Sequence, residues 1–298
     1  MFQWRDMLTR SSGALSGVSR TLSENPALAG LARHSRSPGG KKVIRVLAGA
    51  LGVVLLLAIW WAATDLFHLF KAVILPSPIT VYDTFKDMIS SGEIYQHAWN
   101  SLLRVLLGFA AAAIIGIPIG VIMGWVPWIS LVVDPVVEII RPIPPIAWIG
   151  LALIWFGIGL NSAVFLVFIG AFFPILLNTI SAVRSVDKKL IEVAYTFGAN
   201  DLTILRKVVM PAAAPTIYTG LRVGMGIGWM CVVAAEMVGA NYGLGSLIME
   251  AYGYLRTDIA MVGMISIGLM GLVINIIFQL AGDRIFAWQQ GIGKGGVE

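Results

Sequence analysis

The sequence contains little charge for its length. Only 12% of its 298 residues are Asp, Glu, Lys or Arg, while 58% are apolar and the mean hydropathy is +0.85. Soluble domains carry about 25% charged residues, so this composition excludes an ordinary soluble globular protein. It predicts an integral membrane protein in which apolar runs cross the bilayer as helices. We therefore expect an all-α fold.

Three further scarcities limit the chemistry of the chain. Its single cysteine, Cys231, excludes an internal disulfide, and three scattered histidines form no Cys/His cluster that would indicate a metal site. The phosphate-loop pattern G-x-x-x-x-G-K-[ST] is also missing, which excludes ATP hydrolysis by the chain itself. We expect no metal or cofactor in this chain. If transport is driven by ATP, a separate ATPase subunit must bind ATP and Mg²⁺.

The apolar runs predict six membrane spans, with both termini in the cytoplasm. Residues 1–42 form a basic tail whose dispersed charges and few aromatics favour contact with membrane lipid over nucleic-acid binding. A transmembrane domain follows over residues 43–283, and residues 284–298 form a second tail. Basic residues in the first tail and in the loop 185–215 place both on the cytoplasmic side of the inner (plasma) membrane. The predicted spans are 43–63, 98–123, 143–159, 162–182, 219–240 and 259–282.

Local patterns predict several features within and between these spans. We expect an amphipathic helix over residues 80–89 and a second short helix within 241–258, both on the outer side. Prolines between residues 141 and 146 predict that the third span is entered through a break. Asn178 and Asn275 are expected to form interhelical hydrogen bonds. A neighbouring helix should pack closely against the small residues on one face of the second span, which are Gly108, Gly116, Gly120 and Gly124.

The longest polar interruption in the apolar part of the chain is residues 185–215. Charged and apolar residues alternate there at helical spacing, and Gly198 divides the pattern, so we expect two short helices joined by a glycine turn. Pro211 and Pro215 are predicted to end this pattern before the next span. One side is apolar and contains Leu190, Val193, Ala194, Phe197 and Leu205, whereas the other is basic and contains Lys188, Lys189, Arg206 and Lys207.

The spacing within this loop resembles the coupling loop of ABC-importer permeases. That family has Glu-Ala-Ala, three residues, Gly, nine residues, then Ile, one residue and Leu-Pro. The matching positions here are Glu192, Ala194, Gly198 and Pro211, with Ala199 beside the glycine and apolar substitutions at Val193, Val208 and Met210. The resemblance implies a short cytoplasmic helix that docks into a groove of the ATPase subunit. The alternative is an amphipathic helix on lipid headgroups, and the spacing favours the coupling loop.

Longer stretches, over roughly residues 45–285, resemble one subfamily, the nitrate/taurine/alkanesulfonate/bicarbonate permeases, and the taurine type most closely. The matching segments are SLLR at 101–104, GIPIG at 116–120, RPIPPIAW at 141–148, WFGIG at 155–159, GLR at 220–222, AAE at 234–236 and GLG at 243–245. The resemblance implies a type I (MetI-like) importer fold with a homodimeric pore, two ATPase subunits and an extracytoplasmic substrate-binding protein. In that architecture the third and fifth spans line the pathway, which assigns Pro145, Trp148, Trp229 and Val233 to it.

Two charged residues are further candidates, because charges are costly in a bilayer. Glu236 lies near the outer end of the fifth span, either on the pathway wall or gate or in a structural ion pair. A carboxylate facing the pore would repel an anion, so an anionic substrate favours a pair with Arg104. Arg141 lies beside the predicted break, where free backbone amides attract anions. It either adds a positive charge there or pairs with Glu138, three residues earlier.

These patterns predict the permease subunit of an ATP-driven importer for a small anion such as taurine, an alkanesulfonate, nitrate or bicarbonate. One alternative keeps the importer and changes the cargo to a neutral pyrimidine-type vitamin precursor. Another is an ATP-independent secondary transporter, which predicts inverted repeats or a relay of buried carboxylates. Neither feature is visible in the sequence, which favours the importer.

Overall fold

The structure is a computed structural model and describes residues 38–287, so most of the two predicted tails lies outside it. The described chain consists of helices and turns without a strand, and it divides into two units at Phe70. In the first unit, α3 (Pro38–Trp61) ends in a π-helical turn over Ala62–Leu66. The Phe67 amide closes this turn by donating to the Ala62 carbonyl at 2.9 Å.

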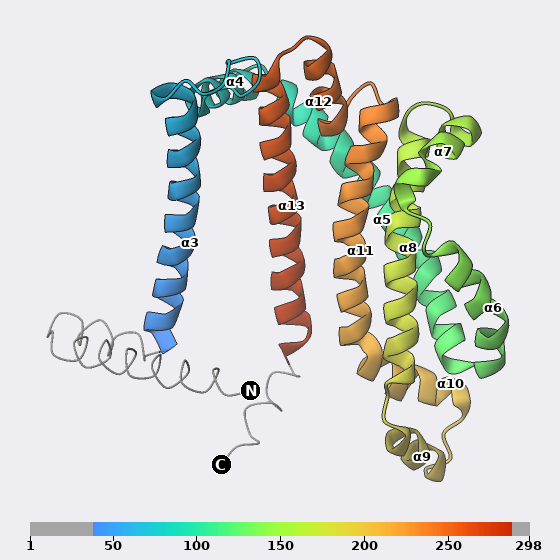
Figure 1. Cartoon of the computed structure of the whole chain (residues 1–298). Coiled ribbons are helices and arrows are strands. Elements are labelled where there is room, and N and C mark those ends of the chain that lie inside the picture. Colours follow the sequence, from blue (N-terminus) through green and yellow to red (C-terminus); the bar gives the residue numbers. More distant parts are fainter. Residues whose placement is uncertain (1–37, 288–298) are drawn as a thin grey trace, which may run out of the picture. The chain divides into compact units, whose positions relative to one another are not determined.

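The second unit contains the remaining helices (Figure 1). They are α4 (Pro78–Ser90), α5 (Glu93–Trp125), α6 (Pro127–Ile140), α7 (Ile149–Phe156), α8 (Leu160–Arg184), α9 (Lys188–Thr196), α10 (Asp201–Ile204), α11 (Met210–Gly239), α12 (Leu244–Gly253) and α13 (Thr257–Ile285). We call the end of this unit that carries α9 the α9 end, and the opposite end, which carries α4 and α12, the α12 end. The two short helices predicted outside the spans correspond to α4 and α12.

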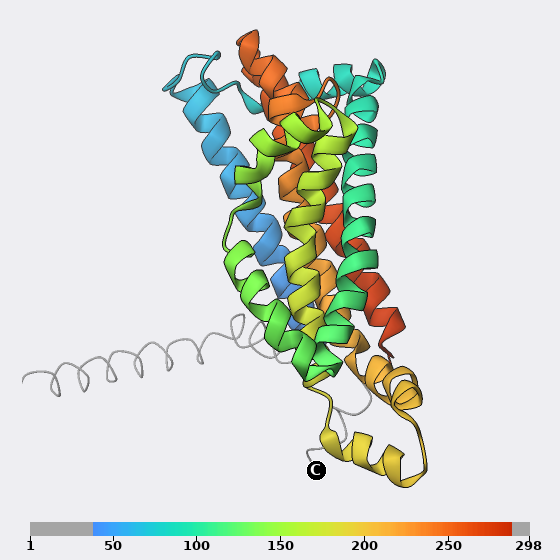
Figure 2. The same cartoon turned by 90° about the vertical axis from the view of Figure 1, so that its right-hand side faces the viewer.

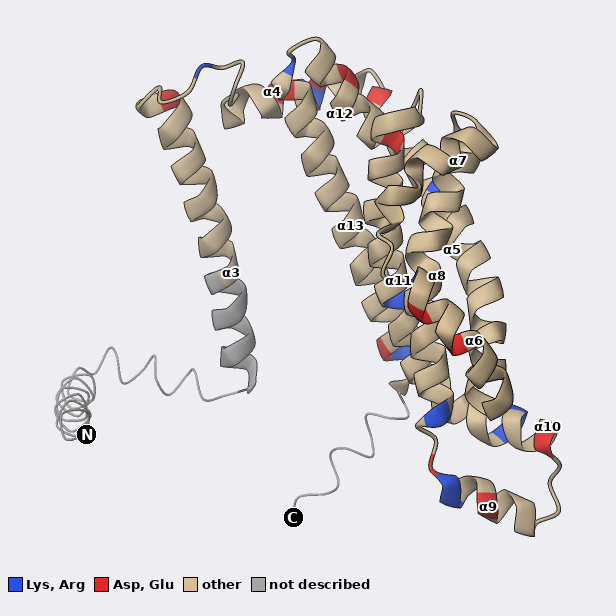
Figure 3. Ribbon diagram, turned by 45° about the vertical axis from the view of Figure 1, so that its right-hand side comes forward, with Lys and Arg blue, Asp and Glu red and all other residues tan. Residues whose placement is uncertain are grey.

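Five helical segments of the described chain are long and apolar enough to cross a membrane, and a bent pair of shorter helices adds a sixth candidate. In the second unit, charged residues lie mostly toward the two ends of the ribbon, and few lie between them (Figure 3). This distribution is expected of helices whose middle parts contact hydrocarbon. The predicted all-α membrane fold is therefore confirmed.

The third predicted span differs from a simple helix. The sequence predicts one span over residues 143–159, but the structure places α6 before the prolines and a 3-10 turn with α7 after them, bent by 82°. Pro142, Pro144 and Pro145 lack amide hydrogens, and their rings clash with the preceding helical turn. The break therefore divides the span in its middle, instead of preceding it.

The prediction that Pro211 and Pro215 end the helical pattern of the loop is wrong. The chain is helical without interruption from Asp201 to Gly239. A π-helical turn over Leu205–Val209 precedes Pro211, and the Met210 amide bonds to the Leu205 carbonyl five residues back. This wider turn accommodates the proline ring at the start of α11. The second half of the loop and the fifth span are therefore one continuous helix.

Helix α8 lies between α5 and α11 and packs closely against both, as Figures 1 and 2 show. A Cβ atom placed on Gly108 of α5 would lie 2.5 Å from the Val167 Cβ and 2.7 Å from the Val164 carbonyl oxygen. On α11, a Cβ on Gly220 would lie 2.5 Å from the Asn178 Cβ. The predicted close packing against the glycine face of the second span is confirmed, and α8 is the neighbour.

The polar residues Asn178 and Asn275 differ in their bonding. Asn275 on α13 accepts hydrogen bonds from Arg222 on α11, as predicted. Asn178 instead donates to the Pro174 carbonyl of its own helix at 2.8 Å, so the prediction of an interhelical bond is wrong there. The amide turns back to the helix because Gly220 of α11 packs directly against its Cβ and offers no side-chain partner.

We expect Gly108→Ala to destabilise the protein by about 1–3 kcal/mol, because the added methyl meets backbone as well as side-chain atoms. Gly116→Ala is the matched control on the same helix, since its Cβ would meet Ile175 and Phe172 at 3.4 Å, an ordinary contact distance. Thermal unfolding of the two variants in detergent measures the difference. Equal transition temperatures for both variants would contradict this account of the packing.

Candidate functional site

The loop between α8 and α11 is held by side-chain caps on both sides of a glycine turn. Asp187 caps α9 by accepting from the Lys189 amide at 2.9 Å, and Asn200 caps α10 by accepting from the Thr203 amide at 2.9 Å. Gly198 has a φ of +77°, a conformation that residues with a Cβ rarely adopt. The predicted helix–glycine–helix turn is therefore present, although its second helix is the start of the long helix that includes α11.

One hydrogen bond connects the two sides of this turn. The Tyr195 hydroxyl at the end of α9 donates to the Asp201 carboxylate at the start of α10, at 2.8 Å. This bond to a carboxylate raises the pKa of the Tyr195 hydroxyl, because ionisation would remove the donor and place two negative charges together. Asp201 also lies in the first helical turn, where a negative charge is favourable. The bond limits the angle between α9 and the long helix.

Helix α9 has an inner and an outer apolar surface. Ile191 and Ala194, with Ala199 after the turn, pack on a buried cluster that includes Ile204 and Val209. Leu190, Val193 and Phe197 face outward, and Phe197 is 86% exposed. The predicted single apolar side, which joined Ala194 and Leu205 to these three residues, is therefore divided. We call Leu190, Val193 and Phe197 the α9 outer surface.

The remaining predicted loop residues lie around this surface. Glu192 is exposed on α9, and Gly198 is exposed in the turn with open space beside it. Pro211 is exposed on the first turn of α11. The turn and Pro211 are separated by the short α10 and the π-helical turn. The predicted residues thus belong to one compact loop at the α9 end.

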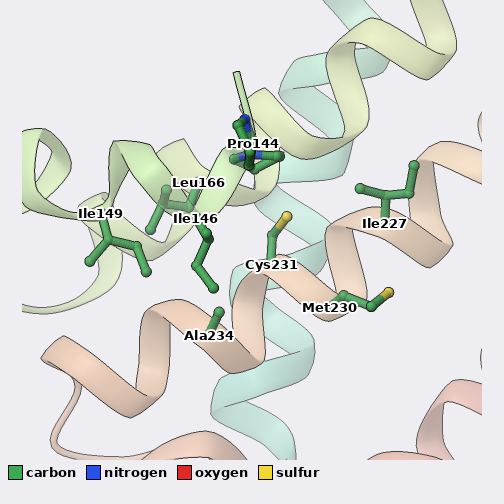
Figure 4. Close-up of a pocket in the computed structure, with 9 residues that line it drawn as sticks. Pro144, Ile146, Ile149, Leu166, Ile227, Met230, Cys231 and Ala234 are labelled. Carbon is green, nitrogen blue, oxygen red and sulfur yellow. The ribbon is translucent and has the colours of Figure 1, made fainter. Parts of the chain in front are cut away.

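A groove follows the break between α6 and α7. One part, of about 250 Å³, is lined by Pro144, Pro145 and Ile146 from the break and by Met230 and Cys231 from α11 (Figure 4). A second part of about 250 Å³ shares Pro145 and Ile227 with the first. We call both parts together the break groove. Its walls are almost entirely apolar.

Arg141 is the charged residue that lines the break groove. Its side chain is exposed, and among the described residues it forms no ion pair, so the alternative of a local pair with Glu138 is wrong. Arg141 caps the end of α6 with helical backbone angles, and its amide donates to the Val137 carbonyl at 2.9 Å, but its side chain lines the groove and does not pair with Glu138. The Arg141 charge is therefore available to the groove.

The other predicted pathway residues do not all border this groove. Trp148 packs edge-on against Phe165, and its indole nitrogen is buried without a hydrogen-bond partner. Trp229 faces α13 and donates to the Ile267 carbonyl at 3.2 Å, while Val233 lies among α11 residues outside the groove. Their assignment to the pathway rests on the family resemblance. Sequence analysis missed the α11 residues that line the groove, although their helical spacing could have shown them: Ile227, Met230, Cys231 and Ala234.

Glu236 forms a buried ion pair near the α12 end. Its carboxylate accepts from the Arg104 guanidinium at 2.7 Å and from the Ser101 hydroxyl at 2.8 Å, both on α5. The Gly245 amide at the start of α12 donates to it at 3.0 Å. Arg104 is 6% exposed and Glu236 is 1% exposed. The predicted pair with Arg104 is confirmed.

The GLG segment closes over this ion pair. Gly243 has a φ of +147°, and a Cβ at this position would overlap the Glu236 carboxylate. The Leu244 amide donates to the Ser101 hydroxyl at 2.9 Å, and His97 bonds to the Gly243 carbonyl at 2.7 Å. The AAE and GLG segments, separated by six residues, therefore belong to one polar network that joins α5, α11 and α12. We call it the Glu236 network.

Comparison with known proteins agrees with this architecture. Residues 116–288 match the model of the family described as the binding-protein-dependent transport system inner membrane component. The chain belongs to this family. A relative in Methanocaldococcus jannaschii, named as an ABC transporter permease protein, is 45% identical over 255 residues, 83% of this chain and 92% of that protein. The taurine transport system permease protein TauC of Escherichia coli is 34% identical over 245 residues, 80% of this chain and 88% of that protein.

The fold is shared with a solved transporter. A structure of the MetNI methionine ABC transporter in an inward-facing conformation matches with a TM-score of 0.54 and 27% sequence identity, over 63% of this chain and 91% of that chain. The chain is thus an ABC importer permease with the MetI-like fold. It is a transport subunit of the inner membrane and not an enzyme, and its family implies an ATPase and a substrate-binding protein as partners.

In this permease we expect Glu236→Ala to lower the stability by about 3–5 kcal/mol, because Arg104 would remain charged and buried without its carboxylate. The double variant Arg104→Met/Glu236→Ala should recover part of the loss, since no charge is then left unpaired. Arg256→Ala, which breaks the exposed pair with Asp258, should cost at most about 1 kcal/mol and is the control. Thermal unfolding measures all three. A double variant that is less stable than Glu236→Ala alone would contradict this role of the ion pair.

Proposed function

We propose that this permease forms half of the pore of an ATP-driven importer for a small sulfonate-type anion such as taurine. Two copies of the chain form the pathway, and two ATPase subunits bind at the α9 end. An extracytoplasmic binding protein delivers the substrate at the α12 end, and the distribution of basic residues in the sequence supports a cytoplasmic position for both termini. ATP and Mg²⁺ bind to the ATPase subunits, and this chain holds no cofactor.

The observation that carries the proposal is the α9 outer surface. Leu190, Val193 and Phe197 are more than half exposed, and burying a side chain of this kind stabilises a complex by about 1.5–3 kcal/mol. Helix α9 lies beyond the ends of α5, α8 and α11 (Figure 2). A helix in this position can insert into a groove of a protein below the membrane, which supports docking on an ATPase over adsorption to lipid headgroups.

The anionic cargo is supported by the charge of the break groove. Arg141 is its charged lining residue, while Glu236 is neutralised by Arg104 and does not border it. A permanent positive charge beside apolar walls attracts a small anion but offers it few hydrogen bonds. The groove would therefore bind the anion weakly, as is expected of a pathway through which the anion must move on. The similarity to the taurine permease of Escherichia coli points to the same cargo class.

The proposed cycle follows from the continuity of the loop with the pathway helix. ATP binding closes the two ATPase subunits, and each carries its docked α9 toward the other. Because the turn is tied by Tyr195 and Asp201, a displacement of α9 moves the long helix that begins at Asp201. That helix lines the break groove through Met230 and Cys231, so its movement opens the groove to the binding protein.

We expect Gly198→Asp to abolish stimulation of ATP hydrolysis by substrate-loaded binding protein, with a loss of roughly tenfold or more. Gly92→Asp is the control for folding and assembly, because Gly92 has a similar φ of +82° and equally open surroundings at the α12 end. The assay uses the complex reconstituted with its ATPase and binding protein. If Gly198→Asp assembles as well as Gly92→Asp and retains the stimulation of wild type, the proposed coupling is wrong.

We also expect Phe197→Asp to prevent binding of the ATPase subunit while the permease remains folded, because the Phe197 side chain contributes nothing to its interior. Tyr82→Asp introduces the same charge at an exposed aromatic position on α4 and is the control. Co-purification of the ATPase with each variant measures binding. Normal assembly of Phe197→Asp would argue that α9 does not dock on the ATPase.

The cargo is identified in the same reconstituted system. We expect taurine or an alkanesulfonate to stimulate hydrolysis and to accumulate inside vesicles, whereas nitrate and bicarbonate should act weakly. If a neutral pyrimidine stimulates hydrolysis and sulfonates do not, the cargo is a vitamin precursor and not an anion. If the chain transports solute without any ATPase, the proposal of an ATP-driven importer is wrong.

A further inference from the structure

A second cavity lies between α11 and α13. Its smaller part, of about 70 Å³, is lined by Trp229 and Asn275, and its larger part, of about 450 Å³, is lined by Tyr218 and Phe286 toward the α9 end. Arg222 and Phe278 line both parts, so the two join at Arg222. No residue of this cavity lines the break groove. We call it the Arg222 cavity.

Arg222 is held in the cavity by a neutral partner. Its Nε donates to the Asn275 Oδ1 at 3.0 Å, and its Nη2 donates to the same oxygen at 2.8 Å. A guanidinium has five N–H groups, so these two bonds orient it and leave the others free. Among residues 38–287, no other side chain or carbonyl accepts from Arg222, and no carboxylate lies within ion-pair distance of it.

The position of Arg222 makes a missing counter-charge significant. At a rise of 1.5 Å per residue, Arg222 lies about 18 Å along α11 from Met210, and Asn275 lies about 15 Å along α13 from Ile285. By the predicted bounds, Arg222 lies three residues inside the start of the fifth span (219–240), with its side chain exposed, and Asn275 lies seven residues before the end of the sixth span (259–282). An arginine in the first turn of a span is favoured when it faces a cavity or an opposite charge.

Arg104 provides an internal comparison, since it lies in a membrane helix of the same chain. There the guanidinium is buried against Glu236, and its charge is neutralised by the protein. Arg222 differs in having an amide partner and open space in front of its free N–H groups. The nearest acidic residue on the cavity wall is Asp283, which lines the larger part but does not pair with Arg222.

We propose that Arg222, oriented by Asn275, binds an oxyanion of the phosphate or sulfonate type in the cavity between α11 and α13. Free guanidinium N–H groups match two oxygens of such a group. Tyr218, Phe278 and Phe286 give the larger part aromatic walls that fit the carbon skeleton attached to the anion. The anion is either the headgroup of an anionic phospholipid or a small anion from solution.

The lipid source is tested with the full-length permease assembled with its ATPase. The complex is placed in mixed nanodiscs of phosphatidylglycerol and phosphatidylcholine, and the lipids that remain bound after detergent extraction are measured by native mass spectrometry. We expect wild type to retain phosphatidylglycerol preferentially and Arg222→Gln to bind it roughly tenfold more weakly. Arg284→Gln, which removes a charge from α13 outside the cavity, should behave as wild type.

The soluble source is tested in phosphatidylcholine nanodiscs, where no anionic lipid competes. Inorganic phosphate and ethanesulfonate are titrated, and thermal stability is recorded, because a ligand that binds the folded state raises the transition temperature. An increase that requires Arg222 identifies a small anion, whereas phosphatidylglycerol retention without this increase identifies the lipid. Arg222→Lys keeps the charge but loses the paired bonds to Asn275, so we expect intermediate binding in either arm.

The proposal is overturned if folded Arg222→Gln equals wild type in both arms. It is also overturned, whether or not Arg222→Gln folds, if wild type retains phosphatidylglycerol no better than phosphatidylcholine and neither anion raises its transition temperature. The test does not depend on the cargo or on ATP, so its failure leaves the importer proposal unaffected.

Discussion

The close approach of α8 to both of its neighbours is the contact on which the second unit depends. Glycines on α5 and α11 bring the three helices together along much of their length, because side chains of α8 pack directly against the backbone at these glycines. In lipid, where burial of apolar surface adds little, such van der Waals contact is a main source of helix association. Because α8 is fixed in this way, its two ends become fixed points for the elements attached to them.

Helix α8 connects the two regions to which the proposal assigns transport. At the α9 end, Arg184 donates to Ser130 and lies 3.5 Å from Asp134, which ties α6 to the last turn of α8 just before the loop that contains α9. Farther along, α8 contributes Leu166 and Ile169 to the break groove. The helix thus holds the loop proposed to dock and the groove proposed for passage in one frame.

Three arginines near or within the spans have different partners for their positive charge. Arg104 is neutralised in the Glu236 network, Arg141 remains unpaired beside apolar walls, and Arg222 is oriented by a neutral amide. The first is structural because its removal leaves a buried charge. The other two keep their charge available, and that availability is the basis for assigning them to anions.

Sequence alone predicts the features that depend on residue type at fixed spacing. The glycine face of α5, the turn at Gly198 and the pair of Glu236 with Arg104 are of this kind. It fails where the outcome depends on how a helix is rotated or continued. Trp229 faces α13 because α11 turns its glycines toward α8, and α11 continues through Pro211 because a π-helical turn supplies the missing room. The two surfaces of α9 become distinct only once the loop folds against the buried cluster below α8.

The unbroken helix from Asp201 to Gly239 also has a mechanical consequence. Its 39 residues span about 58 Å, and Cys231 in the groove lies about 45 Å from its start. In the proposed cycle it would act as a lever whose start is moved by α9. A tilt of about 5° about its first turn would displace Cys231 by about 4 Å, close to the width of a small anion. The π-helical turn over Leu205–Val209 lies near the start of this lever, so in the proposed cycle the stiffness of these five residues would set how much of the α9 displacement reaches the groove.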